Sequence, residues 1–394
     1  MVAIPEAVTR VVARLTADDD TRARWAKWVL CVALAVNFLV SRPLWFSARP
    51  YPTTPVLAFL TPLPVSVDWV LFSALFVLLA AIAVMRRFAA PGLAFIALCT
   101  FLAAADQSRW HPWFYWFVFM MLALVIATVK QTPEATRAAL QACRVLMVGS
   151  YFWAGVQKIN VTFFYNLFPW MLSAVIHDPQ SSPLFSKVGF AIPIIELSVG
   201  LLLFVPALRR WGVLMAVGTH LIILVLIGPL GHNVNANVWP WNAALIALVV
   251  LLFARDESPL RRLVVPSSPI HGVAVALFWI APLFTFFDAW DAYLGFSLYS
   301  GTQRAGYIQL DAPARAALPP ELARYVDDKN RLLASKWSMG EVRTPDYAEP
   351  RIYARLHAYV CEHLPPGSNA HLVIMGKPNR LNGEREQECD AACR

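Results

Sequence analysis

Nine long runs of apolar residues dominate this sequence of 394 residues and constrain its fold more than any other feature. A helix needs about 20 apolar residues to cross a bilayer, and backbone in hydrocarbon must satisfy its hydrogen bonds internally. Most runs approach that length once flanking aromatic and small residues are included. The runs are Trp28–Val40, Val70–Met85, Phe88–Ala105, Phe114–Val129, Val145–Val156, Val188–Leu208, Val213–Leu230, Trp241–Phe253 and Val273–Phe287. The sequence therefore predicts an all-α polytopic membrane bundle of about nine transmembrane helices.

Basic residues are distributed unevenly between the loops that join these runs. Alternate loops, starting with the N-terminal segment, hold most of the arginines and lysines, and the intervening loops hold few. Cytoplasmic loops are enriched in Lys and Arg, so the N-terminus is predicted to be cytoplasmic. With nine crossings the C-terminal part then lies in the periplasm, or outside the cell or in a lumen. The net charge of +8 follows mostly from this asymmetry and does not indicate nucleic-acid binding.

The same patterns divide the chain into three parts. Residues 1–24 form a cytoplasmic segment whose apolar residues from Ile4 to Leu15 share one helical stripe. That stripe fits a helix lying on the membrane surface or one packed on the bundle. Residues 25–290 form the transmembrane domain. Residues 291–394 lack long apolar runs and predict a small exported α+β domain.

Two segments outside the long runs have a recognisable pattern. Residues 351–364 have the spacing of an amphipathic helix with Ile352, Leu356, Tyr359 and Val360 facing inward, and residues 370–376 indicate a strand. Residues 166–178 are too short to span and predict a re-entrant or interfacial helix near Lys158. The polar end of the chain from residue 377 is expected to be mobile.

The six cysteines fall into two groups. Those in or beside the apolar runs are predicted to be packing residues: Cys31, Cys99 and Cys143. Cys361, Cys389 and Cys393 lie in the C-terminal domain, where an oxidising compartment would allow one disulfide and leave one thiol. The spacing does not fix the pair. A metal site from Cys389, Cys393 and His363 is the weaker alternative, because such sites usually show four ligands.

Three polar residues inside apolar runs are the strongest candidates for function, because each is costly at membrane depth. Lys158 ends the run in "YFWAGVQKINVTFF", Glu196 lies within "AIPIIELSVGLLLFV", and His220 lies within "VGTHLIILVL". Lys158 could instead extend to the headgroups, and His220 could be a neutral histidine bonded to a carbonyl. Glu196 has no route to the interface and must be protonated or paired. We expect all three to line one cavity open to the outer leaflet.

Polar loops at the outer ends of the helices are further candidates. The segment "DQSRWHPWFYW" contains Asp106, Gln107, Arg109 and His111, and "GHNVNANVWPWN" runs from Gly231 to Asn242. Both could converge on the cavity beside Lys158. Equally, the first segment could form an ordinary salt bridge and helix cap, and the asparagines could be turn residues. Motifs of soluble enzymes, such as a phosphate-binding glycine loop or a zinc-binding HExxH, do not occur in the sequence.

Several of these segments together resemble the horizontally transferred transmembrane (HTTM) domain family, which is related to vitamin K-dependent γ-carboxylase. They are "DQSRWHPWFYW", "YFWAGVQKIN", "ELSVGLLLF", the Thr219–His220 pair and "NVWPWNAALIAL", in the family's order across residues 20–290. The resemblance implies a carboxylase, a lyase, in which Lys158 is the base that deprotonates vitamin K hydroquinone. It further implies Glu196, His220 and His111 as catalytic residues, and Trp153, Asn237 and Trp241 at the quinone cofactor.

Two departures limit that resemblance. His111 is displaced by about two positions from the family's histidine, and the carboxylases have a far larger lumenal region for their exported protein substrates. A non-catalytic protein that binds a lipid, a quinone or an exported partner is therefore the alternative. A redox membrane subunit similar to the DoxX group is another, because the helix of Glu196 resembles one of theirs. A transporter is least supported, since the sequence shows no paired repeats.

Overall fold

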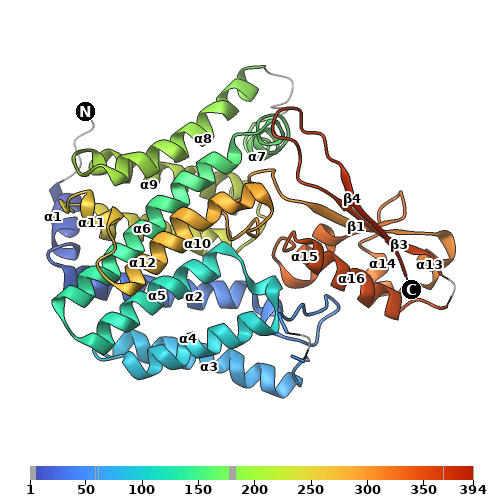
Figure 1. The fold of residues 1–394 in the computed structure, drawn as a ribbon, viewed down its shortest axis with the longest axis horizontal. Helices are drawn as coiled ribbons and strands as arrows, with labels where there is room; N and C mark the ends of the chain where they lie inside the picture. The colour runs from blue at the N-terminus through green and yellow to red at the C-terminus, as the bar shows by residue number, and fades with distance from the viewer. Residues whose placement is uncertain (1–5, 58, 61, 177–182, 367, 394) are drawn as a thin grey trace.

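The computed structural model describes residues 6–57, 59–60, 62–176, 183–366 and 368–393, without the side chains of residues 183–187. A bundle of helices forms one end of the molecule and a small domain with a sheet forms the other (Figure 1). In the bundle the helices are α1 Glu6–Leu15, α2 Asp19–Val40, η1 Arg42–Trp45, α3 Val65–Val84, α4 Ala89–Ala105, η2 Gln107–Arg109, α5 Pro112–Lys130, α6 Pro133–Lys158, η3 Phe163–Leu167, α7 Phe168–Leu172, α8 Pro183–Phe204, η4 Pro206–Leu208, α9 Arg209–Ile227, α10 Val238–Phe253, α11 Arg261–Val264, α12 Pro269–Val275, η5 Ala276–Ile280 and η6 Ala281–Phe287.

Seven of the nine predicted apolar runs each correspond to one described helix, whereas Val188–Leu208 covers α8 and η4 and Val273–Phe287 covers α12, η5 and η6. Five helical segments are long and apolar enough to cross a membrane, and three shorter helices are also apolar. The five are Asp19–Val40, Val65–Val84, Pro112–Lys130, Pro206–Ile227 and Pro269–Phe287, and the three are Ala89–Ala105, Val188–Phe204 and Val238–Phe253. The chain is thus mostly helical and is an integral, multi-pass membrane protein.

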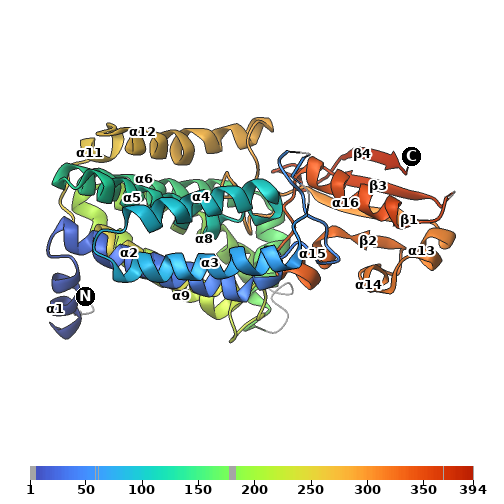
Figure 2. The ribbon, with the colours of Figure 1, turned by 90° about the horizontal axis from the view of Figure 1, so that it is seen from below.

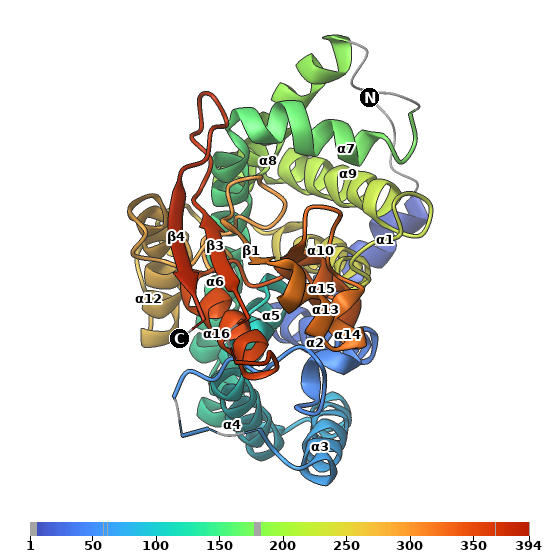
Figure 3. The same cartoon turned by 90° about the vertical axis from the view of Figure 1, so that its right-hand side faces the viewer.

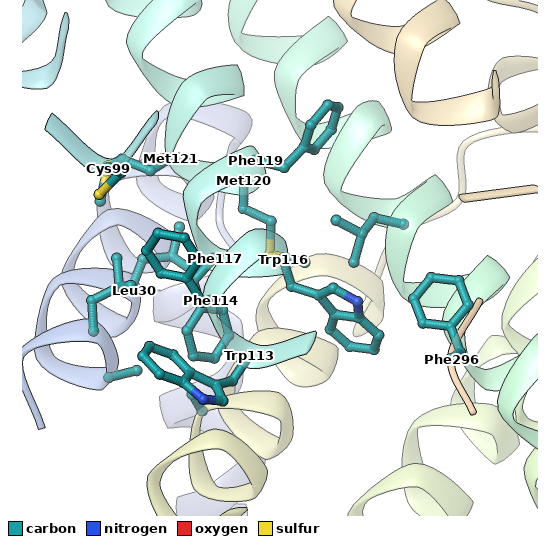
Figure 4. Close-up of a cluster of buried hydrophobic side chains, with 14 of the residues drawn as sticks. Leu30, Cys99, Trp113, Phe114, Trp116, Phe117, Phe119, Met120, Met121 and Phe296 are labelled. Carbon is teal, nitrogen blue, oxygen red and sulfur yellow. The ribbon is translucent and has the colours of Figure 1, made fainter. Parts of the chain in front are cut away.

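Aromatic side chains fill the core between α2, α4 and α5 (Figure 4). Trp113, Phe114 and Phe117 of α5 are all buried and pack beside Leu30 of α2. Cys99 is also buried in this cluster, which agrees with its predicted packing role, as do the buried positions of Cys31 and Cys143. The α5 helix therefore turns one aromatic face to α2 and leaves Trp116 pointing the other way, towards Phe296.

Helix α6 is the central helix of the bundle and contacts α5, α8 and α12. It starts well before the predicted apolar run because Thr132 caps its first turn and Pro133 occupies the first helical position. It crosses α8 at very short range. A Cβ on Gly155 would lie 2.7 Å from the backbone nitrogen of Leu197, and one on Gly200 would lie 3.0 Å from that of Phe152. Small residues on both helices thus allow this close crossing.

The amphipathic helix α1 lies at the end of the bundle away from the sheet (Figures 1 and 2). None of its described residues is buried, and Val8 and Val11 expose about half of their surface. This exposed stripe favours the membrane-surface alternative over packing on the bundle. Ile4, the first residue of the predicted stripe, lies outside the described residues.

The C-terminal domain is a four-stranded antiparallel sheet in the order β2-β1-β3-β4, accompanied by helices (Figure 3). Its elements are β1 Ala305–Leu310, α13 Ala312–Ala317, α14 Pro320–Ala323, β2 Arg331–Leu333, α15 Ala334–Val342, α16 Pro350–Glu362, β3 Ala370–Met375 and β4 Gln387–Ala392. The predicted helix and strand correspond to α16 and β3. Within α16 Tyr359 was expected to face inward, but it is only half-buried, and Tyr353 occupies the buried stripe instead.

A disulfide joins Cys361 of α16 to Cys393 after β4, and Cys389 is a free thiol. The expectation of one disulfide and one thiol is thus confirmed, and the pair is identified. The Cys389, Cys393 and His363 metal alternative is wrong, because Cys393 is in the disulfide. His357, not His363, lies within hydrogen-bonding distance of the two sulfur atoms.

The polar end of the chain was expected to be mobile, but it makes defined contacts with the bundle. Residues after β3 form a long loop that reaches the C-terminal end of α6, and the chain then returns as strand β4 (Figure 1). Arg380 in this loop donates hydrogen bonds to the carbonyl oxygens of Val156 and Ile159, at 3.0 and 3.3 Å, and to Gln157 at 2.6 Å. The polar residues of this loop therefore include one, Arg380, that forms hydrogen bonds with the C-terminal end of α6.

Candidate functional site

A largely apolar cavity of about 170 Å³ lies between α6, α8, α9 and α10. Buried aromatic residues contribute to its wall near the C-terminal end of α6: Phe163 and Phe168 belong to the η3–α7 segment, and Phe296 follows η6. The predicted re-entrant segment near Lys158 is thus present as a short helix that forms part of the cavity wall. The last two residues of that prediction, 177 and 178, lie outside the described residues.

Lys158 and Glu196 form an ion pair in the wall of this cavity. The Lys158 Nζ lies 2.7 Å from Glu196 Oε2, and the two residues expose only 8 % and 6 % of their surface. Lys158 comes from the last turn of α6 and Glu196 from the middle of α8, and the Gly155 crossing brings the two helices close enough for contact. The amine of Lys158 therefore faces the cavity and a carboxylate, and it does not extend to the headgroups.

A second polar group lies two helical turns away on the same face of α6. The Tyr151 hydroxyl lies 2.5 Å from His220 Nε2, and His220 Nδ1 lies 2.7 Å from Asn242 Oδ1. Asn242 donates through Nδ2 to the Val238 carbonyl at 2.7 Å, so its Oδ1 is an acceptor. The assignment of hydrogens follows: His220 carries its proton on Nδ1, and its Nε2 accepts from Tyr151.

These two polar groups give the cavity a defined chemical character. Tyr151 and Lys158 are seven positions apart in the sequence, which places their Cα atoms about 10 Å apart along α6. Apolar side chains, including Ile195 and Leu245, line the space around them. A buried ion pair is costly unless its geometry is good, and polar residues at membrane depth commonly mark functional sites. The arrangement suits a small, mainly apolar molecule that carries two polar atoms.

Four of the predicted site residues line the cavity together: Lys158, Glu196, His220 and Trp241. The other three lie elsewhere. His111 is the buried N-cap of α5 and packs against Tyr293, with 5.6 Å between ring centroids. Trp153 donates from Nε1 to the carbonyl of Trp279 at 3.0 Å. Asn237 is buried at the N-cap of α10. Proximity to the cavity does not test any of the predicted catalytic or binding roles.

The polar segment after α4 forms the ordinary salt bridge that was one of its two interpretations. Asp106 pairs with Arg49 and, at 3.9 Å, with Arg109, and it caps η2 by accepting from Ser108 N at 3.0 Å. Burial of Asp106 raises the pKa of its carboxyl, but the positive charges of the two arginines together lower that pKa below its usual range. Gln107 accepts from Arg351 at 2.6 Å. This segment therefore joins loops and the C-terminal domain, and the convergence of Asp106, Gln107, Arg109 and His111 on the cavity was wrongly predicted.

Sequence reasoning missed several residues of the cavity. Asn242 was noted only as the end of a polar loop, although a side-chain amide inside an apolar helix is itself a signal. Trp116 and Phe296, whose rings meet edge to face at 5.3 Å, carry no such signal because both are ordinary apolar side chains. Their position depends on how the segment after η6 folds back over the bundle.

The comparisons with known proteins concern the same region of the chain. Residues 136–235 match the family model of the methylamine utilisation protein MauE. The resemblance to the HTTM family was wrong: "YFWAGVQKIN", "ELSVGLLLF" and Thr219–His220 all lie inside the MauE match. The carboxylase activity inferred from that resemblance has no support. No curated protein and no solved structure matches this chain.

Proposed function

We propose that this membrane protein binds a lipid-soluble ring compound of the quinone class in its reduced, hydroxyl-bearing form. The observation that carries the proposal is the pair of polar groups in the wall of the apolar cavity. The hydrogen of Tyr151 is committed to His220, so the oxygen of Tyr151 is free to accept from a ligand hydroxyl. The Lys158 ammonium can donate to an oxygen on the opposite side of the ring. A hydroquinone has both a hydroxyl that can donate to Tyr151 and a second oxygen, across the ring, that can accept from Lys158.

The size and lining of the cavity support a single ring. A volume of about 170 Å³ resembles that of the engineered apolar cavity of about 150 Å³ that binds benzene. Ligand sites are typically apolar with a few polar groups that fix orientation. Trp241 adds one such group, because its indole N–H has no hydrogen-bond partner among the described residues.

The charges in the cavity favour a neutral ligand over a cation. Glu196 is the one carboxylate among the described residues of the wall, and Lys158 already neutralises it. A second cation would meet the ammonium of Lys158 in a medium of low dielectric constant. The MauE description speaks of methylamine utilisation, and by this argument a methylammonium ion is not the favoured occupant of this cavity.

The match to MauE supports the cavity as the functional region. Residues 136–235 include most of α6, all of α8 and all of α9, and with them Tyr151, Lys158, Glu196 and His220. The C-terminal domain lies outside that match. The part of the chain that is similar to a known family is therefore the part that builds three walls of the cavity.

Acid–base chemistry on the bound ring is a second candidate, and the 2.7 Å Lys158–Glu196 contact favours it. Transfer of a proton from Lys158 to Glu196 would leave a neutral amine, which could take the proton of a ligand hydroxyl. Lys158→Arg tests this candidate because arginine keeps the charge but cannot act as a base. The variant should still bind the hydroquinone but should no longer hold it as the anion, which is measured by the ultraviolet absorbance of the bound compound under anaerobic conditions. The same anion absorbance in both proteins would reject the base.

The topology that accompanies this proposal has nine crossings, with the N-terminus in the cytoplasm and the C-terminal domain exported. It rests on the distribution of basic residues between loops. In that orientation Lys158 and the aromatic closure of the cavity lie towards the outer face, because they adjoin the C-terminal domain. The ligand would then occupy the outer half of the bilayer.

The binding test uses a variant that removes the ion pair without leaving a buried charge. A single substitution would leave one partner uncompensated at a cost of about 3 to 5 kcal/mol, so the double variant Lys158→Met with Glu196→Leu is preferred. Protein in phospholipid nanodiscs is titrated anaerobically with reduced ubiquinone lacking a tail. The double variant should bind at least about tenfold more weakly, which corresponds to about 1.4 kcal/mol.

The matched control removes an ion pair of the C-terminal domain, Arg324→Met with Glu341→Leu. This control should bind the hydroquinone as the unmodified protein does. Unchanged binding in the Lys158 and Glu196 double variant would contradict the proposal, as would equal affinity for the oxidised quinone and the hydroquinone. The melting temperature of each variant shows whether it is folded.

A further inference from the structure

The cavity is large enough for a ring but not for a lipid-soluble molecule with a long tail. Its volume of about 170 Å³ is close to that of an engineered cavity filled by benzene alone. Any chain attached to the ring must therefore leave the cavity. The route of that chain depends on which wall of the cavity also forms the outer surface of the bundle.

The wall towards α10 and the inner face of α6 is closed at the level of Tyr151 and Asn242. Ser150 and Tyr151 of α6 and Asn242 and Leu245 of α10 line the cavity and are buried. At the outer end Phe163, Phe168 and Phe296 are buried as well. These side chains have neighbours on the side away from the cavity, so a chain could not pass them without displacing the core.

The wall between α8 and α9 differs. At the inner ends these helices touch, because a Cβ on Gly212 would lie 2.8 Å from the backbone nitrogen of Leu203. Nearer the outer ends the lining residues are also part of the molecular surface: Ile222 of α9 is 56 % exposed, and Thr219 and Ile195 are partly exposed. Each of these side chains borders the cavity on one side and the exterior on the other.

The exterior at this position is apolar. Ile194 and Leu201 on α8 and Leu214, Leu221 and Val225 on α9 are all exposed. Surfaces of this kind on membrane-spanning helices face hydrocarbon. The cavity wall between α8 and α9 thus adjoins the interior of the bilayer and not water.

We propose that the ring reaches the cavity sideways from the bilayer, between α8 and α9, and that the ligand carries a long apolar tail which stays in the hydrocarbon. The inference rests on the proposed function and adds the class and route of the ligand. The tail gains little from the protein, because lipid is as apolar as the helix surface. The ring and its two polar contacts then provide the affinity, and the gap beside Ile195, Thr219 and Ile222 provides the passage.

The test narrows the passage and compares ligands that differ only in their tail. Ile222→Trp and Ile195→Trp place bulk in the gap. Val225→Trp is the matched control, because Val225 is exposed on α9 but does not line the cavity. Each protein in phosphatidylcholine nanodiscs is titrated anaerobically with reduced ubiquinone without a tail and with a long isoprenoid tail.

The gap variants should lose about tenfold more affinity for the tailed compound than for the tail-less one. Val225→Trp should bind both compounds like the unmodified protein. Equal loss of both compounds, or no loss of the tailed one, would overturn the sideways route while leaving the cavity as the binding site. If the unmodified protein binds neither compound, the proposed function fails and the inference fails with it.

Discussion

Gly155 sets the distance between Lys158 and Glu196 although it is not part of the ion pair. A Cβ at this position would lie 2.7 Å from the nitrogen of Leu197 and 2.8 Å from the carbonyl oxygen of Pro193. Both atoms belong to backbone, so α6 and α8 would have to separate. Gly155→Ala should therefore destabilise the protein by about 1 to 3 kcal/mol and weaken hydroquinone binding, as measured by thermal unfolding in detergent and by titration.

Gly218 is the matched control for that substitution. Apart from the neighbouring backbone of α9 itself, a Cβ on Gly218 would have no atom of the described residues within 4 Å. Gly218→Ala should therefore leave binding unchanged and stabilise the helix by about 0.5 to 1 kcal/mol, because alanine loses less backbone entropy than glycine. Similar effects of Gly155→Ala and Gly218→Ala on hydroquinone binding would show that the crossing at Gly155 does not position Lys158.

His111 makes stability depend on pH, although it lies outside the cavity. Burial lowers the pKa of His111 to about 4, whereas the unfolded chain has a value of about 6.5. The unfolded state therefore binds more protons between these values, and the free energy of unfolding falls as the pH drops from about 6.5 to about 4, by about 3 kcal/mol in total. The melting temperature of His111→Gln should depend less on pH than that of the unmodified protein. An equal pH dependence in the two proteins would contradict the role of His111.

At the scale of elements, the loop between β3 and β4 holds the end of α6 that carries Lys158. The last carbonyl groups of a helix have no partners within it, and Arg380 donates to two of them, those of Val156 and Ile159. The carbonyl of Arg380 also accepts from Val161 N at 3.0 Å. Arg380→Ala should cost about 2 kcal/mol and weaken hydroquinone binding, because the last turn of α6 loses its charged donor.

Hydrogen exchange measures that effect directly. In Arg380→Ala the amides of the last turn of α6 should exchange faster, while those of α10 should keep their protection. Arg315→Ala is a suitable control, since Arg315 is in the C-terminal domain and pairs with Asn330 there. Unchanged exchange at the end of α6 would show that the loop touches the helix without stabilising it.

The helices could be predicted from the sequence because a long apolar run is itself the signal for a membrane helix. Lys158, Glu196 and His220 were recognisable for the complementary reason that polar groups are costly there. Their partners could not be predicted. The register of α6 on α8 depends on the close crossing at Gly155, and the Asn242 contact depends on the position of α10. The hydrogen bonds of Arg380 to the end of α6 could not be predicted, because a polar segment that contacts a helix end has the same composition as a mobile segment.

At the scale of the whole molecule, the cysteines offer a test of orientation that needs no added label site. Cys361 and Cys393 are joined in a disulfide, and Cys31, Cys99 and Cys143 are buried in the bundle. Cys389 is the one partly exposed free thiol of the described residues, and it lies on the edge strand β4 of the C-terminal domain. A thiol reagent should therefore report the location of that domain alone.

If the C-terminal domain is exported, a membrane-impermeant maleimide added to intact cells should label the protein at Cys389. Cys389→Ser should abolish the labelling, and Arg10→Cys on the exposed polar face of α1, in the Cys389→Ser background, should be labelled only after permeabilisation. Labelling of Cys389 that requires permeabilisation would reverse the orientation. Lys158 and the aromatic closure of the cavity would then lie on the cytoplasmic side, and a hydroquinone would have to reach them from the inner leaflet.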